Sequence, residues 1–163
     1  MENFLYDSLK EENIMIIVGY QGIGQSTLAN CCLKYIDLES GCFWVNGKRA
    51  EDWYIPYYQM AEYLSKQGYC VFTSSHEPVR KLLAKSSEKV IAICPHPDLR
   101  DEWIAKLRKR AEDTGLEKDH KAFLNAADRY TENINEIAND IDDTRYITSL
   151  EYDLEGIING KLE

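Results

Sequence analysis

The strongest constraint on the fold is an apolar run at residues 14–18 that leads directly into a glycine-rich segment and then a potential helix. An uninterrupted run of this kind is typical of a strand buried on both faces of a parallel sheet. Glycines at positions 19, 22 and 24 let successive backbone N–H groups turn inward at the N-terminus of the following helix. The segment therefore predicts a strand, a loop that can surround an anion, and a helix beginning at about residue 24.

The loop matches most of the phosphate-binding (P-loop) pattern, which is Gly-x-x-x-x-Gly-Lys followed by Ser or Thr. Gly19, Gly24, Ser26 and Thr27 occupy the expected positions, whereas Gln25 stands in place of the lysine. A chance match is the alternative, but the strand before the loop and the helix after it are the context that the motif requires. We expect the nucleotide phosphates to be bound by Gly19, Gln21, Gly22, Ile23, Gly24, Gln25, Ser26 and Thr27.

Gln25 preserves the backbone cradle but removes a full positive charge from the neighbourhood of the β- and γ-phosphates. Its amide can still donate a neutral hydrogen bond, which is about half as strong as a charge-assisted one. Loss of one preorganised hydrogen-bond donor at a developing charge slows catalysis about a hundredfold to a thousandfold, and we expect loss of a cation to slow it at least as much. We therefore expect binding to survive better than catalysis, while Ser26 keeps the hydroxyl that can bind Mg²⁺.

The composition is that of a single domain spanning residues 1–163. Of these residues 44% are hydrophobic, which is enough for one sizeable core. No apolar run approaches the roughly 20 residues of a membrane span, and the N-terminus lacks a secretory signal, so we expect a cytoplasmic protein. The five cysteines contain no C-x-x-C pair and predict neither a disulfide framework nor a zinc site.

The net charge of −9 is unevenly distributed along the chain. Half of the 28 acidic residues, but only five of the 19 basic ones, lie after residue 110. An acidic C-terminal third repels a polyanion, so general nucleic-acid binding is disfavoured. A basic cluster at residues 106–110 is the one local candidate for such binding.

Strands alternate with helices along the rest of the chain. Further strands are predicted at residues 35–40, 69–75, 89–94 and 145–150, and helices at 24–33, 51–67, 77–86, 98–113, 118–139 and 152–158. Gly68 should end one of these helices, and Pro95 and Pro97 should stop the strand before them. The alternation predicts an α/β fold with a parallel five-stranded sheet, helices on both faces in three layers, and ligands at the carboxyl ends of the strands.

Acidic and polar side chains follow two predicted strands at the edge where ligands should bind. Asp37 and Glu39 share one face of the second strand. Asp37 could hold Mg²⁺ through water or take a proton from an acceptor hydroxyl, and the alternative is a solvated strand end. His76 begins a helix directly after a buried strand, although Ser74 and Ser75 could simply cap that helix.

Basic and aromatic residues around the 51–67 helix could form a substrate pocket. Eleven tyrosines in the chain make ordinary packing the alternative for the aromatic residues. Arg80, one turn into the 77–86 helix, could face either the site or water. The substrate-site candidates are Asp37, Glu39, Arg49, Trp53, His76 and Arg80.

A predicted helical lid at about residues 96–116 carries a packing stripe and several arginines. Leu99, Trp103 and Leu107 recur at a spacing of four residues and form the stripe. A phosphoryl-transfer site without its loop lysine needs cations from elsewhere, and arginines on a mobile segment supply them when it closes. The alternative is a solvated basic face. The catalytic candidates are Gln25, Asp37, Arg100, Arg108 and Arg110.

The chain resembles small P-loop kinases of the nucleoside monophosphate kinase and gluconate kinase type, especially phage deoxynucleotide kinases. The resemblance lies in the P-loop and in the segments at residues 36–40, 71–76 and 95–110. The resemblance spans about residues 14–150, and the P-loop is its specific part. It implies that the loop binds the ATP phosphates, that Ser26 and Asp37 serve Mg²⁺, and that lid arginines close over the transferred phosphoryl group. The departures are Gln25, either natural or a substitution that traps a bound state, and the lack of an aspartate after the third strand.

Two functions of different class follow from these features. The first is an ATP- and Mg²⁺-dependent phosphotransferase that acts on a small acceptor, preferably a (deoxy)nucleoside monophosphate, and is impaired by Gln25. The alternative is a noncatalytic nucleotide-binding or sensing module of the same fold. A nucleic-acid end-processing kinase that uses the basic cluster at residues 106–110 is a weaker third hypothesis.

Overall fold

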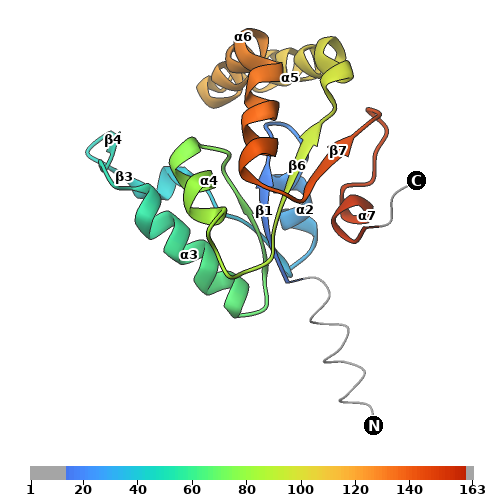
Figure 1. Cartoon of the computed structure of the whole chain (residues 1–163). Coiled ribbons are helices and arrows are strands. Elements are labelled where there is room, and N and C mark those ends of the chain that lie inside the picture. Colours follow the sequence, from blue (N-terminus) through green and yellow to red (C-terminus); the bar gives the residue numbers. More distant parts are fainter. Residues whose placement is uncertain (1–13, 161–163) are drawn as a thin grey trace.

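The protein is built on a five-stranded, all-parallel sheet, which the computed structural model describes within residues 14–160 (Figure 1). The strand order is β2-β5-β1-β6-β7. The strands are β1 (Ile16–Gly19), β2 (Tyr35–Asp37), β5 (Cys70–Thr73), β6 (Val90–Pro95) and β7 (Thr144–Ile147). At the centre of the sheet, Ile17 is in register with Phe72 on one side and Ile91 on the other. The predicted α/β fold with a parallel sheet is confirmed.

Helices cover the sheet on both sides, which fits the predicted three-layer arrangement. They are α2 (Gln25–Cys31), α3 (Tyr54–Lys66), α4 (Glu77–Leu83), α5 (Arg100–Thr114), α6 (Glu117–Asp140) and α7 (Leu154–Ile158). The chain crosses the sheet in one direction through α2 and in the opposite direction through α3, α4 and α6. Right-handed crossovers therefore place α2 on the other face from these three helices. Figure 1 shows α3 and α4 on one side of the sheet and α2 and α7 on the other.

The apolar run at residues 14–18 supplies the central strand. Met15, Ile16, Ile17 and Val18 are each at most 1% exposed. The chain leaves β1 toward the β2 edge and later passes to β6 on the opposite side of β1. Such a reversal of strand order is a topological switch point, and ligands of open α/β sheets bind in the crevice outside the carboxyl ends of strands there. The glycine-rich loop begins at this crevice.

The second strand is shorter than predicted. β2 ends at Asp37, and a 3-10 turn η1 (Ser40–Phe43) and a small antiparallel hairpin of β3 (Trp44–Val45) and β4 (Lys48–Arg49) follow. Asn46 and Gly47 have φ angles of 51° and 76°, as a two-residue type I′ turn requires. Arg49 therefore lies in a strand of this hairpin, in register with Trp44.

The strand that the sequence places before Pro95 and Pro97 ends one residue later than predicted. Pro95 is the last residue of β6 and is in register with Ile147 of β7. Proline lacks an N–H group, but β1 ends at Gly19, which is in register with Ile93. The missing donor at Pro95 therefore faces no strand on the β1 side, and the sheet tolerates it. A second 3-10 turn, η2 (Pro97–Leu99), then leads into α5.

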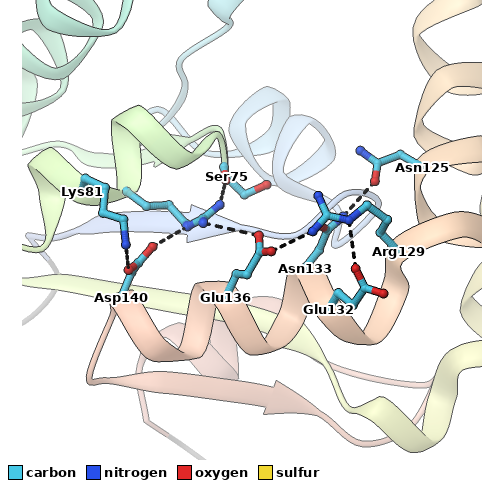
Figure 2. A network of polar contacts seen from close by, with 9 residues as sticks. Ser75, Lys81, Asn125, Arg129, Glu132, Asn133, Glu136 and Asp140 are labelled. Carbon is cyan, nitrogen blue, oxygen red and sulfur yellow. Dashed lines mark hydrogen bonds and ion pairs between the residues drawn. The ribbon is translucent and has the colours of Figure 1, made fainter.

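An ion-pair network around the buried Arg80 side chain connects α4 to α6 (Figure 2). Arg80, which is 6% exposed, donates from Nε to an Asp140 carboxylate oxygen at 2.9 Å and from Nη1 to the Ser75 carbonyl at 2.6 Å. Lys81 Nζ donates to the second Asp140 oxygen at 2.6 Å. Glu136 lies 3.7 Å from Arg80 Nη2. A guanidinium buried to this extent is stable only because carboxylates compensate its charge.

The same network reaches a kink in α6 (Figure 2). Arg129 has non-helical φ and ψ angles of −133° and 28°, and its side chain bonds Glu132 at 3.0 Å and Glu136 at 2.8 Å. The kink separates the first half of α6, which approaches the glycine-rich loop, from a second half in which Ile134 and Ile137 are buried in the core.

Replacing Asp140 by asparagine tests the network. Asp140→Asn removes one of two carboxylates near Arg80, so we expect the free energy of unfolding to fall by about 2–3 kcal/mol. Burial opposes the shift, but hydrogen bonds from Lys81 and Arg80 lower the pKa of Asp140. This stabilisation is therefore present above the ordinary carboxyl pKa and is lost as the pH falls through the lowered one.

Urea unfolding at pH 7 and at acid pH measures the effect. The exposed pair member Glu132 is the control, because Glu132→Gln should change stability by less than about 0.5 kcal/mol. Equal losses in the two variants would show that Arg80 does not depend on Asp140.

Candidate functional site

The glycine-rich loop, residues 19–27, connects β1 to α2 and packs closely against α5. Gly22 and Gly24 have φ angles of +84° and +98°, which side-chain-bearing residues rarely adopt. A Cβ atom on Gly22 would lie 2.7 Å from Leu107 Cδ2, and one on Gly19 would lie 2.4 Å from Gln25 Oε1. Backbone conformation therefore requires glycine at positions 22 and 24, and close packing against Leu107 requires it at position 22 as well.

Three consecutive carbonyl groups of the loop are bound on their outer side by side chains from distant segments. The donors are Trp103 Nε1, Lys106 Nζ and Tyr152 OH, which lie 2.9, 2.8 and 2.8 Å from the carbonyl oxygens of Gln21, Gly22 and Ile23 respectively. In a trans peptide the next N–H points opposite to the carbonyl. The N–H groups of residues 22–24 therefore face away from these donors, which is the orientation that a concavity of successive N–H groups requires.

The side chains that follow the loop meet the end of β2. Ser26 Oγ donates to Asp37 Oδ2 at 2.6 Å, and Gln25 Nε2 donates to Asp37 Oδ1 at 3.3 Å. The amide oxygens of Gln21 and Gln25 are buried and have no hydrogen-bond partner among the described residues. The predicted loop residues and Asp37 are thus brought together, with a hydroxyl and a carboxylate side by side.

Ser26 and Asp37 offer oxygen atoms of the kind that Mg²⁺ prefers. Within residues 14–160, no group of three or more His, Cys, Asp or Glu side chains could hold a metal ion by itself. Mg²⁺ commonly keeps several waters and binds through one or two protein groups together with substrate phosphates. The pair therefore fits a metal that is shared with a phosphate ligand.

A cleft of about 210 Å³ opens beside the loop. It is lined by Gln21, Gly22, Gly24, Gln25, Ser26, Thr27, Glu39, Leu107, Arg110, Lys118, Asp119 and Ala122. Arg110 Nε pairs with Asp119 at 3.2 Å. Lys118 forms no ion pair within the part of the chain that the structure describes. The lining of the cleft therefore combines residues of the glycine-rich loop with two cationic side chains from α5 and α6 and two acidic ones, Glu39 and Asp119.

The three predicted lid arginines lie in different environments. Arg110 lines the cleft, whereas Arg100 bonds Asp101 and the Ala127 carbonyl, and Arg108 pairs with Glu112. The structure does not bring Arg100 and Arg108 to the cleft. Lys109 is likewise paired, with Asp113 at 2.6 Å. The basic cluster at residues 106–110 is therefore largely neutralised within the chain.

The segment predicted as a lid is anchored along one face. Trp103 and Leu107 are 0% and 2% exposed, as the predicted packing stripe requires. Because the same two side chains contact Gln21 and Gly22, α5 packs directly against the loop and its Leu107 and Arg110 line the cleft.

A second group of predicted residues meets around the β3–β4 hairpin. The Arg49 guanidinium carbon lies 4.7 Å from the Trp53 ring centroid and 5.8 Å from that of Trp44. Its Nη1 is 3.1 Å from His76 Nε2, and Nη2 donates to Ser40 Oγ at 2.9 Å. Arg49 Nε is buried without a hydrogen-bond partner in the described residues. The structure thus unites the predicted residues Arg49, Trp53 and His76.

His76 holds Arg49 as a neutral acceptor. Partial burial, reinforced by the charges of Arg49 and Arg80, lowers the pKa of His76. Its Nδ1 lies 2.9 Å from Ser74 Oγ, so the neutral ring can donate to Ser74 and accept from Arg49. Neither Ser74 nor Ser75 caps α4, whose N-cap residue is His76 without a side-chain cap. Arg80 is committed to the α4–α6 network and does not join this group.

Sequence reasoning did not assign Lys106, Lys118 or Tyr152 to the site. Lys106 follows Trp103 by three residues, so the two share a helix face, and this spacing could have suggested a common contact. Tyr152 carries no local signal, because its contact with Ile23 spans 129 residues of chain.

Comparison with known proteins adds no relative to this description, since no protein-family model and no curated protein matches the sequence significantly. Among the described residues, no helix combines the length and the apolar character that crossing a bilayer requires.

Alanine at Gly22 and Gly24 separates backbone strain from packing. Gly24→Ala imposes only the left-handed conformation, because the nearest atom to its Cβ is 3.8 Å away, and should cost about 1–2 kcal/mol. Gly22→Ala adds the overlap with buried Leu107 and should cost about 1–3 kcal/mol more. Urea unfolding measures both. Equal losses would contradict tight packing of α5 on the loop.

Proposed function

We propose that the protein is a P-loop-type phosphotransferase that uses ATP and Mg²⁺ to phosphorylate a small acceptor, preferably a (deoxy)nucleoside monophosphate. The observation that carries this proposal is the set of inward N–H groups at residues 22–24, next to the paired Ser26 and Asp37, at the switch point of a parallel sheet. Backbone N–H groups that line a concavity bind phosphate oxygens, and a hydroxyl and a carboxylate bind the metal ion that accompanies a triphosphate.

Two cationic side chains of the cleft support a polyphosphate ligand. Gln25 supplies no cation, but Lys118 and Arg110 line the cleft together with the acidic residues Glu39 and Asp119, and Arg110 is paired with Asp119. Arginine can bind phosphate oxygens through two parallel hydrogen bonds, and lysine acts as a compact positive charge. These two side chains would provide the electrostatic stabilisation that the loop lacks.

Ser26 and Asp37 are the residues that would hold Mg²⁺. Bound there, the metal would neutralise charge on the β- and γ-phosphate oxygens. The hydrogen bond between Ser26 and Asp37 keeps both oxygens oriented toward the same place, and the Gln25 amide supports the second Asp37 oxygen.

The Arg49 group supports an acceptor that carries a phosphate and an aromatic base. The contacts of Arg49 are an imidazole, a hydroxyl and two indole rings, none of which carries a negative charge. Its charge is therefore free to pair with a phosphate. Trp44 is 50% exposed and offers an open ring face for stacking. Ser40, which Arg49 contacts, directly follows Glu39 of the cleft, so the two sites adjoin.

A noncatalytic nucleotide-binding or sensing module is the second candidate, and Gln25 is the observation that favours it. The amide occupies the position of the P-loop lysine and is hydrogen-bonded to Asp37. The same binding groups would then hold a nucleotide without transferring its phosphoryl group, because ground-state binding alone does not accelerate chemistry.

Thermal shift with ATP and a panel of nucleoside mono- and diphosphates, with and without Mg²⁺, tests the binding proposal. ATP at about a hundred times its dissociation constant should raise the melting temperature by about 5 °C or more. A suitable monophosphate should raise it further, and Arg49→Met should remove only this second increment. No shift with ATP would contradict both candidate functions.

Restoring the loop lysine distinguishes an enzyme from a binding module. In a γ-phosphate transfer assay, Gln25→Lys should raise turnover at least about tenfold with little change in stability, because a cation then stabilises the transferred group. Unchanged turnover would show that residue 25 does not limit the chemistry. Absence of transfer in both proteins, with ATP still bound, would favour the sensing module.

A further inference from the structure

The outer side of the glycine-rich loop carries a cation that the cleft itself does not contain. Lys106 Nζ lies 2.8 Å from the Gly22 carbonyl oxygen and 3.1 Å from Tyr152 OH. Its ammonium is 4.1 Å from the Trp103 ring centroid and 5.1 Å from that of Tyr152, within the range of cation–π contacts. The lysine is therefore fixed between two aromatic rings against the loop.

The contacts of Lys106 continue along the loop through a second hydrogen bond. Lys106 Nζ donates to Tyr152 OH, and Tyr152 OH donates to the Ile23 carbonyl at 2.8 Å. Hydrogen bonds linked in series polarise one another, so a charged first donor strengthens the next bond. Lys106 thus acts on two adjacent peptide groups, directly at Gly22 and indirectly at Ile23.

The peptide groups transmit this effect to the inner side of the loop. A cation on the Gly22 carbonyl increases the polarity of the peptide unit whose N–H belongs to Ile23, and that N–H points the opposite way. Burial, with the neighbouring charge of Arg110, lowers the pKa of Lys106, which indicates that water covers the ammonium incompletely. A partly desolvated charge is screened less than one on an open surface.

We propose that Lys106 is a positioning residue for the triphosphate: it holds the Gly22 carbonyl outward and supplies, from behind the loop, positive charge in place of the lysine that Gln25 replaces. This inference rests on the proposed nucleotide site. Trp103 and Tyr152 hold the neighbouring carbonyl groups of Gln21 and Ile23 outward in the same way, by donating hydrogen bonds to them.

The test is a comparison of ATP dissociation constants by calorimetry in the full chain. Lys106→Met keeps the aliphatic stem between the rings and removes the charge, so affinity should fall about tenfold, as expected for a charge one peptide unit from the anion. Lys106→Arg keeps the charge and should bind within about threefold of wild type. Lys109→Met, on an exposed site of the same helix, is the matched control and should not change affinity.

Combining these changes with Gln25→Lys distinguishes charge compensation from a structural brace. If Lys106 compensates for Gln25, the loss caused by Lys106→Met should shrink to less than about threefold when residue 25 is lysine. An equal loss of ATP affinity with glutamine and with lysine at position 25 would show that Lys106 does not compensate for Gln25. Should Lys106→Met fail to fold, Tyr152→Phe interrupts the second hydrogen bond while keeping Lys106, and a loss of about threefold is expected.

The outcomes also separate this inference from the proposed function. If wild type binds ATP and Lys106→Met binds it equally well, the inference is wrong and the nucleotide site stands. If wild type binds no ATP while remaining folded, the nucleotide site fails, and the role of Lys106 fails with it.

Discussion

The docking of distant side chains on the outer carbonyls of the glycine-rich loop is the interaction on which the site depends. Glycines allow the loop to adopt its conformation, but glycines alone would leave the loop flexible. A flexible loop loses conformational entropy when it binds a ligand. Trp103, Lys106 and Tyr152 hold three successive carbonyls outward and so direct the following N–H groups inward before any ligand is present. Burial of Trp103 and Leu107 ties this arrangement to the core.

The same arrangement explains how the site can tolerate an unusual charge distribution. A glutamine at position 25 leaves the inner wall without the usual cation, and its amide is hydrogen-bonded to Asp37. Positive charge is placed elsewhere, with Arg110 and Lys118 in the lining of the cleft and Lys106 on the Gly22 carbonyl. Under the proposed function, cations at these positions would favour a bound polyphosphate, whereas a lysine in the loop itself would follow the transferred phosphoryl group. The proposed function therefore assigns binding to these cations and the limit on catalytic rate to residue 25.

Local sequence patterns predicted the parallel sheet, the loop and the meeting of Ser26 with Asp37, because apolar runs and glycine spacing act over short stretches of chain. The hairpin at Asn46 and Gly47 was missed although the Asn-Gly pair between Val45 and Lys48 is a known turn signal. Arg80 could not be assigned from its helix position, since its partners come from α6, far along the chain. The contact of Tyr152 with Ile23 was unpredictable for the same reason.

The most direct test of the central claim is to follow the backbone amide resonances of Gly22, Ile23 and Gly24 by NMR while inorganic tripolyphosphate is added. Inward N–H groups that bind an anion should show the largest shift changes in the spectrum and saturate together at one dissociation constant. Shifts confined to surface lysines, or no saturable change at these three amides, would contradict a preorganised phosphate-binding loop.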